Sequence, residues 1–430
     1  MKILVIGLDG AVPERLLGDE RLGNLRQLME IGCYGPVECV IPPTPVPAWM
    51  CLATGRDPGL LGVYGARGRA DRGDRGAGAM PSRPREAAAI WDLIEASGKH
   101  AVLLGTSREP GGVISPLHGP GSSDPDPRGE ADEAGLGHRI EASSREQFNR
   151  ARRLLSDRPW DYFQIVDSGL ARLERAARGQ NDPGHVRREA EDVIADHYGY
   201  LDGEIGGLLE LLTEDTIVLI IAPCGAQGPD AAFGVNEWLV REGLLVLNQD
   251  RRAGTTLTEA DVDWDRTKVW SEGADCARLF FNVRGREPSG VIAPEDYEAF
   301  RDELKARLKA AVDEEGRALH ALVFRPEDIY GEVRGIAPDL IAPFRRADGM
   351  ANGAFILAGP ALPVQGALEG VHLLDIAPTL LELGGYDIPE AMRGRPLTAG
   401  RLSEVESPAT GQLDEEELIR DRLRGLGYIA

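Results

Sequence analysis

Three side chains that could take part in chemistry stand at the ends of apolar runs in the sequence. They are Asp9, Asp167 and Cys224. A carboxylate in such a place could bind a metal ion or transfer a proton, and a cysteine thiolate could act as a nucleophile or as a soft metal ligand. A buried, inert cysteine is the alternative for Cys224, because no histidine lies close to it in the sequence.

The apolar runs before these side chains predict buried parallel strands, because they are continuous and bounded by turn residues. Such runs occur at Lys2–Gly7, Ala101–Gly105, Tyr162–Val166, Thr216–Ile221, Asp339–Phe344 and Ala354–Ala358. Helical spacing of apolar residues predicts helices at Leu22–Ile31, Ala88–Ser97, Arg187–Leu212, Pro294–Val312 and Leu374–Leu383. This alternation predicts an α/β fold with a mostly parallel central sheet flanked by helices. Ligands of such sheets bind at the carboxyl ends of the strands, where all three side chains would fall.

The chain is expected to divide into a core and a smaller insertion. Residues 1–248 form the first part of the α/β core, with irregular loops at 64–86 and 108–142, where glycine, proline, arginine or acidic residues are dense. Residues 249–331 are expected to be a smaller α+β insertion, because an apolar strand and a long helix follow each other there. Residues 332–400 complete the core, and residues 401–430 form a tail with a docking helix.

Composition excludes several classes of protein. The chain has 430 residues and a formal charge of −22, which argues against a nucleic-acid partner. Five scattered cysteines, an odd number, do not suggest a disulfide framework or a CxxC zinc site, and a reducing cytoplasm is the expected location. No apolar stretch approaches the roughly 20 residues that span a bilayer, so no membrane partner is expected.

Three motifs in a fixed order point to a family. They are the opening Val5–Gly10, the proline-rich segment Pro42–Trp49, and the run Leu374–Leu383 followed by Pro389 to Gly394. Together they resemble the alkaline phosphatase superfamily, in particular its type I phosphodiesterase and nucleotide pyrophosphatase branch. The resemblance implies an alkaline-phosphatase-like fold with two metal ions, commonly zinc, that hold a phosphoryl group while a threonine attacks it.

The nucleophile position departs from this family pattern. It falls two residues before the Pro-Ala-Trp run, on Pro45, which has no hydroxyl group. Thr44 stands one position early. It could act as the nucleophile only if the segment shifted by one residue and a metal or a base activated it.

The residues at the metal-ligand positions of the family also differ from the family pattern, and more widely. Asp9 matches the first aspartate of the family, but Ala171 and Arg175 stand where an aspartate and a histidine would bind one metal. The Ser-Asp-His-Gly of the family corresponds to Ala222–Gly225, which contains Cys224, and no histidine precedes Gly353 in the last ligand loop. Asp9 is then the only ligand retained of six, and one carboxylate does not hold a catalytic metal.

We therefore expect no metal cofactor, with zinc or manganese only if the site is intact in a form that the sequence does not reveal. Arg175 could replace part of the lost positive charge and pair with Asp9, or it could face solvent. A phosphorylated small molecule could bind through Asp9, Thr44, Arg172 and Arg175 together with nearby backbone amides. A partner protein is the other binding possibility.

The leading hypothesis is a pseudoenzyme with a binding or regulatory role, because the ligands of both metals are missing together. The alternative is an active hydrolase of phosphate or sulfate esters with an altered metal set or without metal. A third possibility is non-hydrolytic chemistry at Cys224. Catalytic activity, oligomeric state and pathway are left open by the sequence.

Overall fold

The computed structural model describes residues 1–66, 68–69, 84, 87–106, 133–178, 186–225, 234–248, 261–273, 276–312, 321–344, 352–360, 362–397, 419 and 424. The side chains of residues 133–134, 178 and 186–190 lie outside this description. Within these ranges no helix combines the length and the apolar character that a bilayer crossing requires.

The central sheet has eight strands in the order β10-β2-β9-β5-β1-β4-β3, with β11 pairing to β2. Their bounds are β1 Lys2–Leu8, β2 Cys33–Glu38, β3 Ala101–Leu104, β4 Tyr162–Asp167, β5 Thr216–Ala222, β9 Gly353–Ala358, β10 Gly366–Ala367 and β11 Val371–His372. The strands β5, β1, β4 and β3 are parallel, whereas β9 runs antiparallel between β2 and β5. The predicted α/β fold is confirmed, but the strand predicted at Ala354–Ala358 is antiparallel to its neighbours.

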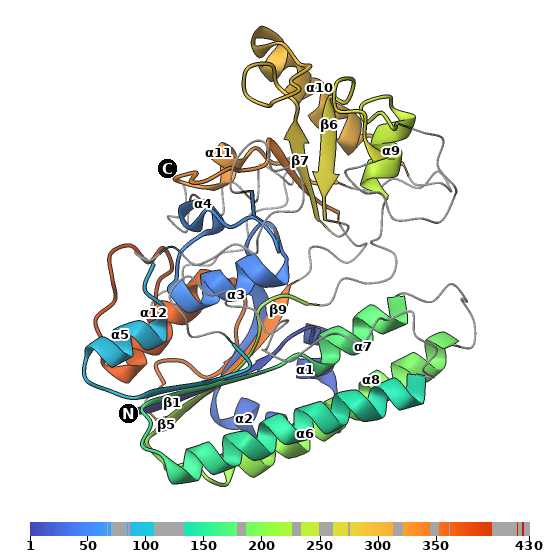
Figure 1. The fold of residues 1–430 in the computed structure, drawn as a ribbon. Helices are drawn as coiled ribbons and strands as arrows, with labels where there is room; N and C mark the ends of the chain where they lie inside the picture. Colours follow the sequence, from blue (N-terminus) through green and yellow to red (C-terminus); the bar gives the residue numbers. More distant parts are fainter. Residues whose placement is uncertain are drawn as a thin grey trace.

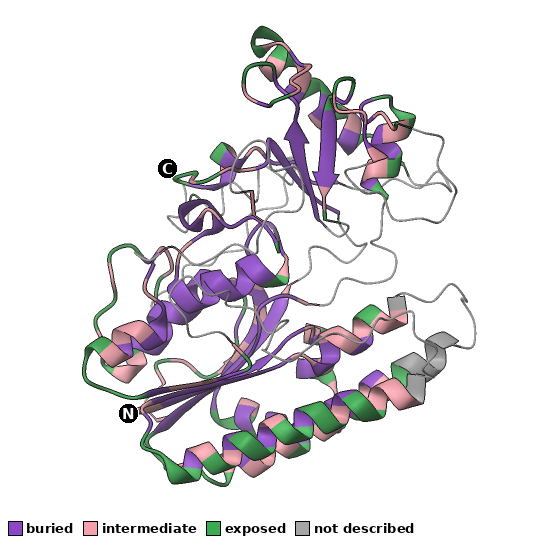
Figure 2. Ribbon diagram, in the orientation of Figure 1, coloured by how far each residue is buried: buried purple, intermediate pink, exposed green. Residues whose placement is uncertain are grey.

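The inner strands β1, β4, β5 and β9 are buried on both faces, which explains why they are apolar at successive positions (Figures 1 and 2). Ile3 and Val5 of β1 belong to one hydrophobic cluster with helices α3 (Pro45–Thr54), α5 (Ile90–Ala96) and α12 (Ile376–Gly384). Leu4 and Ile6 belong to the opposite cluster, with α2 (Gly23–Ile31), α6 (Glu133–Asp157), α7 (Gly169–Arg178) and α8 (Val186–Leu209). Successive strand residues therefore anchor the two helical layers, as the two-residue side-chain period requires.

A second sheet of three antiparallel strands, β6-β7-β8, lies beyond the central sheet (Figure 1). The strands are β6 Val269–Glu272, β7 Cys276–Phe281 and β8 Leu340–Pro343, and they pack with α9 (Val235–Arg241) and α10 (Tyr297–Lys309) in one cluster. The strand predicted at Asp339–Phe344 thus pairs with β7 and not with the central sheet. Its continuous burial gives no sign of which sheet it joins. The division into core and insertion stays a prediction.

Three further segments differ from the sequence expectation. The proline-rich segment begins a helix at Pro45, because proline is tolerated in the first helical turn. Residues 133–142, expected in an irregular loop, belong to α6. Strand β2 was not expected, since Gly35 and Pro36 interrupt it and its burial alternates. The predicted docking helix of the tail lies outside the described residues except for Ile419 and Arg424.

Shorter elements complete the described chain. They are α1 Pro13–Gly18, α4 Pro58–Leu61, η3 Pro294–Asp296, α11 Pro326–Ile329 and η4 Leu373–Asp375. A fourth cluster of buried residues, which includes Ile41, Tyr64 and Tyr330, joins the second sheet to the segment that leads into α3.

Candidate ligand site at the carboxyl edge of the sheet

Asp9 lies directly after β1 and is held by backbone bonds on both sides. Its N–H donates to the carbonyl of Asp167 at 2.9 Å, and its carbonyl accepts from the N–H of Ala171 at 3.0 Å. Gly10 allows this close approach. It adopts a left-handed φ of 81°, and a Cβ atom there would lie 2.6 Å from the Cα of Ala171. The position that the resemblance assigns to a metal-binding aspartate is therefore occupied by an alanine packed against the backbone.

The carboxylate of Asp9 is buried and only half satisfied. The indole Nε1 of Trp49 on α3 donates to Oδ1 at 2.9 Å, while Oδ2 has no hydrogen-bond partner among the described residues. Burial raises the pKa of Asp9 from 3.8 to about 6, although the Trp49 hydrogen bond and the positive charge of Arg175 lower it, and Asp167 raises it further. Asp9 thus holds a proton more readily than an ordinary aspartate.

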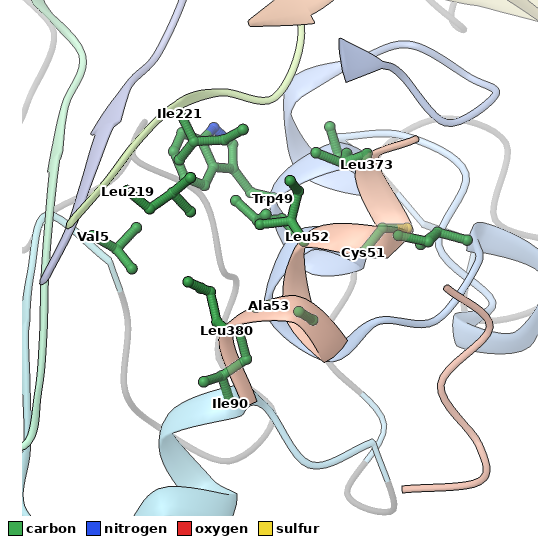
Figure 3. Packing of buried hydrophobic residues seen from close by; sticks show 14 of the residues in the cluster. Val5, Trp49, Cys51, Leu52, Ala53, Ile90, Leu219, Ile221, Leu373 and Leu380 are labelled. Carbon is green, nitrogen blue, oxygen red and sulfur yellow. The ribbon is translucent and has the colours of Figure 1, made fainter. Parts of the chain in front are cut away.

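Trp49 connects this edge to the core. Its ring lies beside Ile221 and Leu219 of β5 (Figure 3), and a Cβ atom at Gly7 would lie 2.3 Å from its Cη2. Helix α3 is buried from Val46 to its end at Thr54, so the indole has little freedom to leave Asp9.

Arg175 is exposed on α7, and its charge reaches Asp9 without a hydrogen bond to Oδ2 of that carboxylate. Of the two alternatives for Arg175, pairing with Asp9 or facing solvent, the structure shows an exposed residue that makes no hydrogen bond to Oδ2 of Asp9. Arg172, one turn earlier on α7, is half-buried. A ligand-binding role for either arginine stays a prediction.

Thr44 is the N-cap residue of α3, but its side chain does not cap the helix. Its Oγ1 is buried and has no hydrogen-bond partner among the described residues. The N–H groups of Thr44 and Ala48 donate to Pro42 and Thr44 carbonyls, and the two prolines between them have no N–H. Pro45, at the nucleophile position of the family pattern, is the first residue of the helix.

Cys224 is bonded to Cys39 in a disulfide whose Cα atoms are 5.8 Å apart. The candidate thiolate nucleophile or soft metal ligand is therefore not a free thiol in this structure. The sequence argued against a disulfide framework and gave no sign of this single bond, and Cys224 is not the free, inert cysteine considered as the alternative. The two residues are separated by 185 positions, and only the order of the strands brings them together.

A buried histidine beside Asp167 was not expected at this edge. His197 of α8 places Nε2 3.8 Å from Oδ1 of Asp167, and Nε2 has no hydrogen-bond partner among the described residues. The same Oδ1 accepts from the N–H of Gly169 at 2.7 Å. The signal was available, since His197 lies three residues after Ile194 and four before Leu201 on the apolar face of the helix.

Asp202 on α8 has a structural role. Its carboxylate oxygens accept hydrogen bonds from the N–H groups of Asn24 and Leu25 and from Nδ2 of Asn24. The aspartate therefore acts as a cap for α2, because it accepts hydrogen bonds from two N–H groups of the first turn, those of Asn24 and Leu25.

The two-metal centre implied by the resemblance does not fit the described residues. Across those ranges, no three His, Cys, Asp or Glu side chains gather as they would around a metal ion. Alanine, arginine and a disulfide sulfur stand at ligand positions, and Asp9 alone supplies a carboxylate among them. His118, His185 and His320, and residues 345–351 of the last ligand loop, lie outside the described residues.

A mostly parallel sheet between two helical layers, with a phosphate-type site expected at its carboxyl edge, defines an alkaline-phosphatase-like α/β protein. The model of the type I phosphodiesterase / nucleotide pyrophosphatase family matches residues 3–348. The chain therefore belongs to this family.

Solved structures share the fold at low sequence identity. Human ectonucleotide pyrophosphatase / phosphodiesterase 5 is 14% identical with a TM-score of 0.56, and the alignment covers 94% of this chain and 98% of that chain. Phosphonoacetate hydrolase from Sinorhizobium meliloti 1021 is 14% identical with a TM-score of 0.55, covering 90% and 95%. Alkaline phosphatase PafA is 12% identical with a TM-score of 0.54, covering 92% and 98%. No curated protein sequence matches the chain.

Proposed function

We propose that this chain is a binding or regulatory member of its family that has lost the two-metal site and takes a phosphorylated ligand at the carboxyl edge of the sheet. The observation that carries the proposal is the replacement of ligand positions by Ala171, Arg175 and the disulfide sulfur of Cys224. A phosphoryl-transfer site needs a concentrated positive charge. Here the guanidinium groups of half-buried Arg172 and exposed Arg175 supply positive charge, and the remaining carboxylate favours a proton.

Side chains would contribute most to holding the phosphate on the α7 side, because two of the first three N–H groups of the helix already have partners. The N–H of Gly169 donates to Asp167, and the N–H of Ala171 donates to the Asp9 carbonyl. These donors at the start of the helix are thus already used. Among the described side chains of this helix, the guanidinium groups of Arg172 and Arg175 are the cations that could bind an anion.

The α3 side offers a small set of donors. Within Thr44–Ala48, Val46 is the one residue whose N–H could face a ligand, because the others lack an N–H or donate it within the chain. The hydroxyl of Thr44, which has no partner among the described residues, is next to it in the same turn. A ligand there would meet one hydroxyl and one amide, which suits binding, and no described residue accepts a hydrogen bond from the hydroxyl as an activating base would.

Isothermal titration calorimetry tests the proposal. Titration of the wild type with AMP and with inorganic phosphate should release heat of binding. The affinity for both ligands should be lower in Arg175→Met. The matched control is Arg153→Met, which removes an exposed arginine near the carboxyl end of α6. This variant should bind the ligands as the wild type does. No heat at millimolar ligand, or equal affinity in both variants, would contradict the proposed site.

An active hydrolase of phosphate or sulfate esters is the second candidate. It is favoured by two buried oxygens without partners among the described residues, Oδ2 of Asp9 and Oγ1 of Thr44, because oxygen atoms can bind a metal ion such as zinc or manganese. Nitrophenyl phosphate mono- and diesters and a nitrophenyl sulfate, each with and without added zinc or manganese, are suitable substrates. Turnover that is lost in both Asp9→Asn and Thr44→Ala would support this function and overturn the first.

The sequence predicts two kinds of partner, a phosphorylated small molecule or a protein. The calorimetry described above tests the small molecule, and the protein partner stays a separate prediction. The cytoplasmic location expected from the sequence also stays a prediction.

A further inference from the structure

The Cys39–Cys224 disulfide joins two strands that are not neighbours in the sheet. Cys39 directly follows β2, and Cys224 is the second residue after β5, while β9 lies between these strands. Two strand spacings amount to about 10 Å. The Cα atoms of the two cysteines are only 5.8 Å apart, so the segments converge beyond the carboxyl ends of β2 and β5.

The backbone beneath the disulfide is shaped for this convergence. Gly353 begins β9 between the two segments, and a Cβ atom there would lie 1.9 Å from the Ala222 carbonyl oxygen. The N–H of Gly225 donates to the Asn352 carbonyl at 3.0 Å, and Gly225 also forms a bridge with Gly10. Backbone contacts therefore connect the ends of β1, β5 and β9, and β2 pairs with β9 up to Val37 and Gly353. The disulfide adds a covalent link between the segments that follow β2 and β5.

We propose that the Cys39–Cys224 disulfide takes the place of a bound metal as the cross-link of this edge. Cys224 stands where the resemblance puts a metal-binding histidine, and a metal ion there would join segments that are distant in the sequence. The disulfide joins such segments covalently. The inference concerns the stability of the edge and does not depend on the ligand of the proposed function.

The cross-link forms by thiol–disulfide exchange with a small disulfide such as oxidised glutathione. A Cys39 or Cys224 thiolate attacks the glutathione disulfide and releases one reduced glutathione; the second cysteine then displaces the other. The two protein thiols lose two electrons and two protons, and one glutathione disulfide becomes two thiols. Such a bond persists in an oxidising compartment, which argues against the reducing cytoplasm expected from the sequence.

The disulfide also fixes the segment that leads to Thr44. The disulfide anchors Cys39, the first residue of this segment. The hydroxyl of Tyr330 donates to the carbonyl of Ile41, and the N–H of Thr44 donates to the carbonyl of Pro42 at 2.8 Å. Opening the disulfide removes the covalent one of these three restraints. The edge is therefore expected to respond to reductants and to be indifferent to chelators.

The first test counts thiols. The full-length protein is equilibrated with oxidised glutathione, denatured, alkylated and weighed by mass spectrometry. Three of the five cysteines should be alkylated, namely Cys33, Cys51 and Cys276, and all five after reduction. Peptide mapping should find Cys39 joined to Cys224. Five alkylated cysteines before reduction, or a different pair, would overturn the proposal.

The second test compares a dithiol with a chelator by thermal unfolding. Dithiothreitol should lower the Tm of the wild type by about 5 °C, toward that of Cys39→Ala/Cys224→Ala, and leave the double variant unchanged. Cys33→Ala, which removes a buried free thiol from β2, is the matched control and should respond to dithiothreitol as the wild type does. EDTA should shift none of the proteins. A Tm lowered by EDTA, or a wild type insensitive to dithiothreitol, would show that the disulfide does not replace the metal.

Discussion

Replacing Asp9 by asparagine tests directly whether the edge of the sheet holds a proton or a cation. The Asp9→Asn variant would keep an oxygen that accepts from Trp49 but would never carry a charge at this position. If the carboxylate has no cationic partner, removing its charge should stabilise the folded chain at high pH. If a bound cation compensates the carboxylate, the same change should destabilise it.

The magnitude follows from the pKa of Asp9, which burial raises from 3.8 to about 6. A rise of this size corresponds to about 3 kcal/mol in the free energy of unfolding. Between the two values the folded chain keeps the proton and the unfolded chain has released it. The contribution of Asp9 to the stability of the wild type is therefore most favourable below pH 3.8, falls as the pH rises toward 6, and changes little above it. About 1.4 kcal/mol of this loss falls between pH 5 and pH 8.

Urea unfolding followed by tryptophan fluorescence, at several pH values from 5 to 8, measures the effect. The asparagine variant carries a constant cost of about 1 to 2 kcal/mol for its buried amide, so the informative quantity is the change with pH. Relative to the wild type, the variant should gain about 1.4 kcal/mol from pH 5 to pH 8. Asp202→Asn is the matched control. Its carboxylate already accepts three hydrogen bonds, so the change should destabilise the chain at every pH.

The reasoning would be refuted if the free energies of unfolding of Asp9→Asn and the wild type differed by the same amount from pH 5 to pH 8. A constant difference would mean that Asp9 is ionised in the folded chain over this whole range. A variant that becomes less stable as the pH rises would point to a cation at the carboxylate. Repeating the series in EDTA separates a bound metal, whose effect the chelator removes, from an arginine, whose effect it leaves in place.

Three further predictions concern the contacts around this edge. Trp49→Phe removes the indole donor to the Asp9 carboxylate and should cost about 1 to 3 kcal/mol in urea unfolding at pH 8; an unchanged stability would mean that water replaces the indole. Tyr330→Phe removes the hydrogen bond to the Ile41 carbonyl and should cost about 1 to 2 kcal/mol in the same assay, with no dependence on pH. Sulfate, which keeps its charge over this range, should bind more weakly in calorimetry as the pH rises through about 6 and Asp9 becomes negative; an affinity independent of pH would place the anion away from Asp9.

The central sheet was predictable where burial on both faces imposes continuous apolar runs. Strands β4 and β5 follow the expected ranges for this reason. Strand β2 was not predictable by the same rule, because one of its faces is only half covered and a proline interrupts it. Helix α3 was missed because prolines at its first and third positions look like breakers, although the first turn of a helix needs no N–H from them.

Within the candidate site, the sequence predicted the position of a residue only where that residue directly follows a single predictable strand. Asp9 is of this kind, because β1 alone puts it at the carboxyl edge. The partners of the other residues depend on the order of strands and the register of helices. Cys39 reaches Cys224 because β2 lies two strands from β5, and His197 reaches Asp167 because α8 packs against α7.

The same distinction explains the chemistry of the edge. The resemblance predicts which metal ligands are missing, but it does not predict what holds the corresponding segments together. In the structure a disulfide, a backbone bridge between glycines and an indole hydrogen bond connect these segments. None of the three can carry the positive charge of a metal. Burial raises the pKa of the aspartate left among them, and the charge of Arg175 offsets this rise only in part.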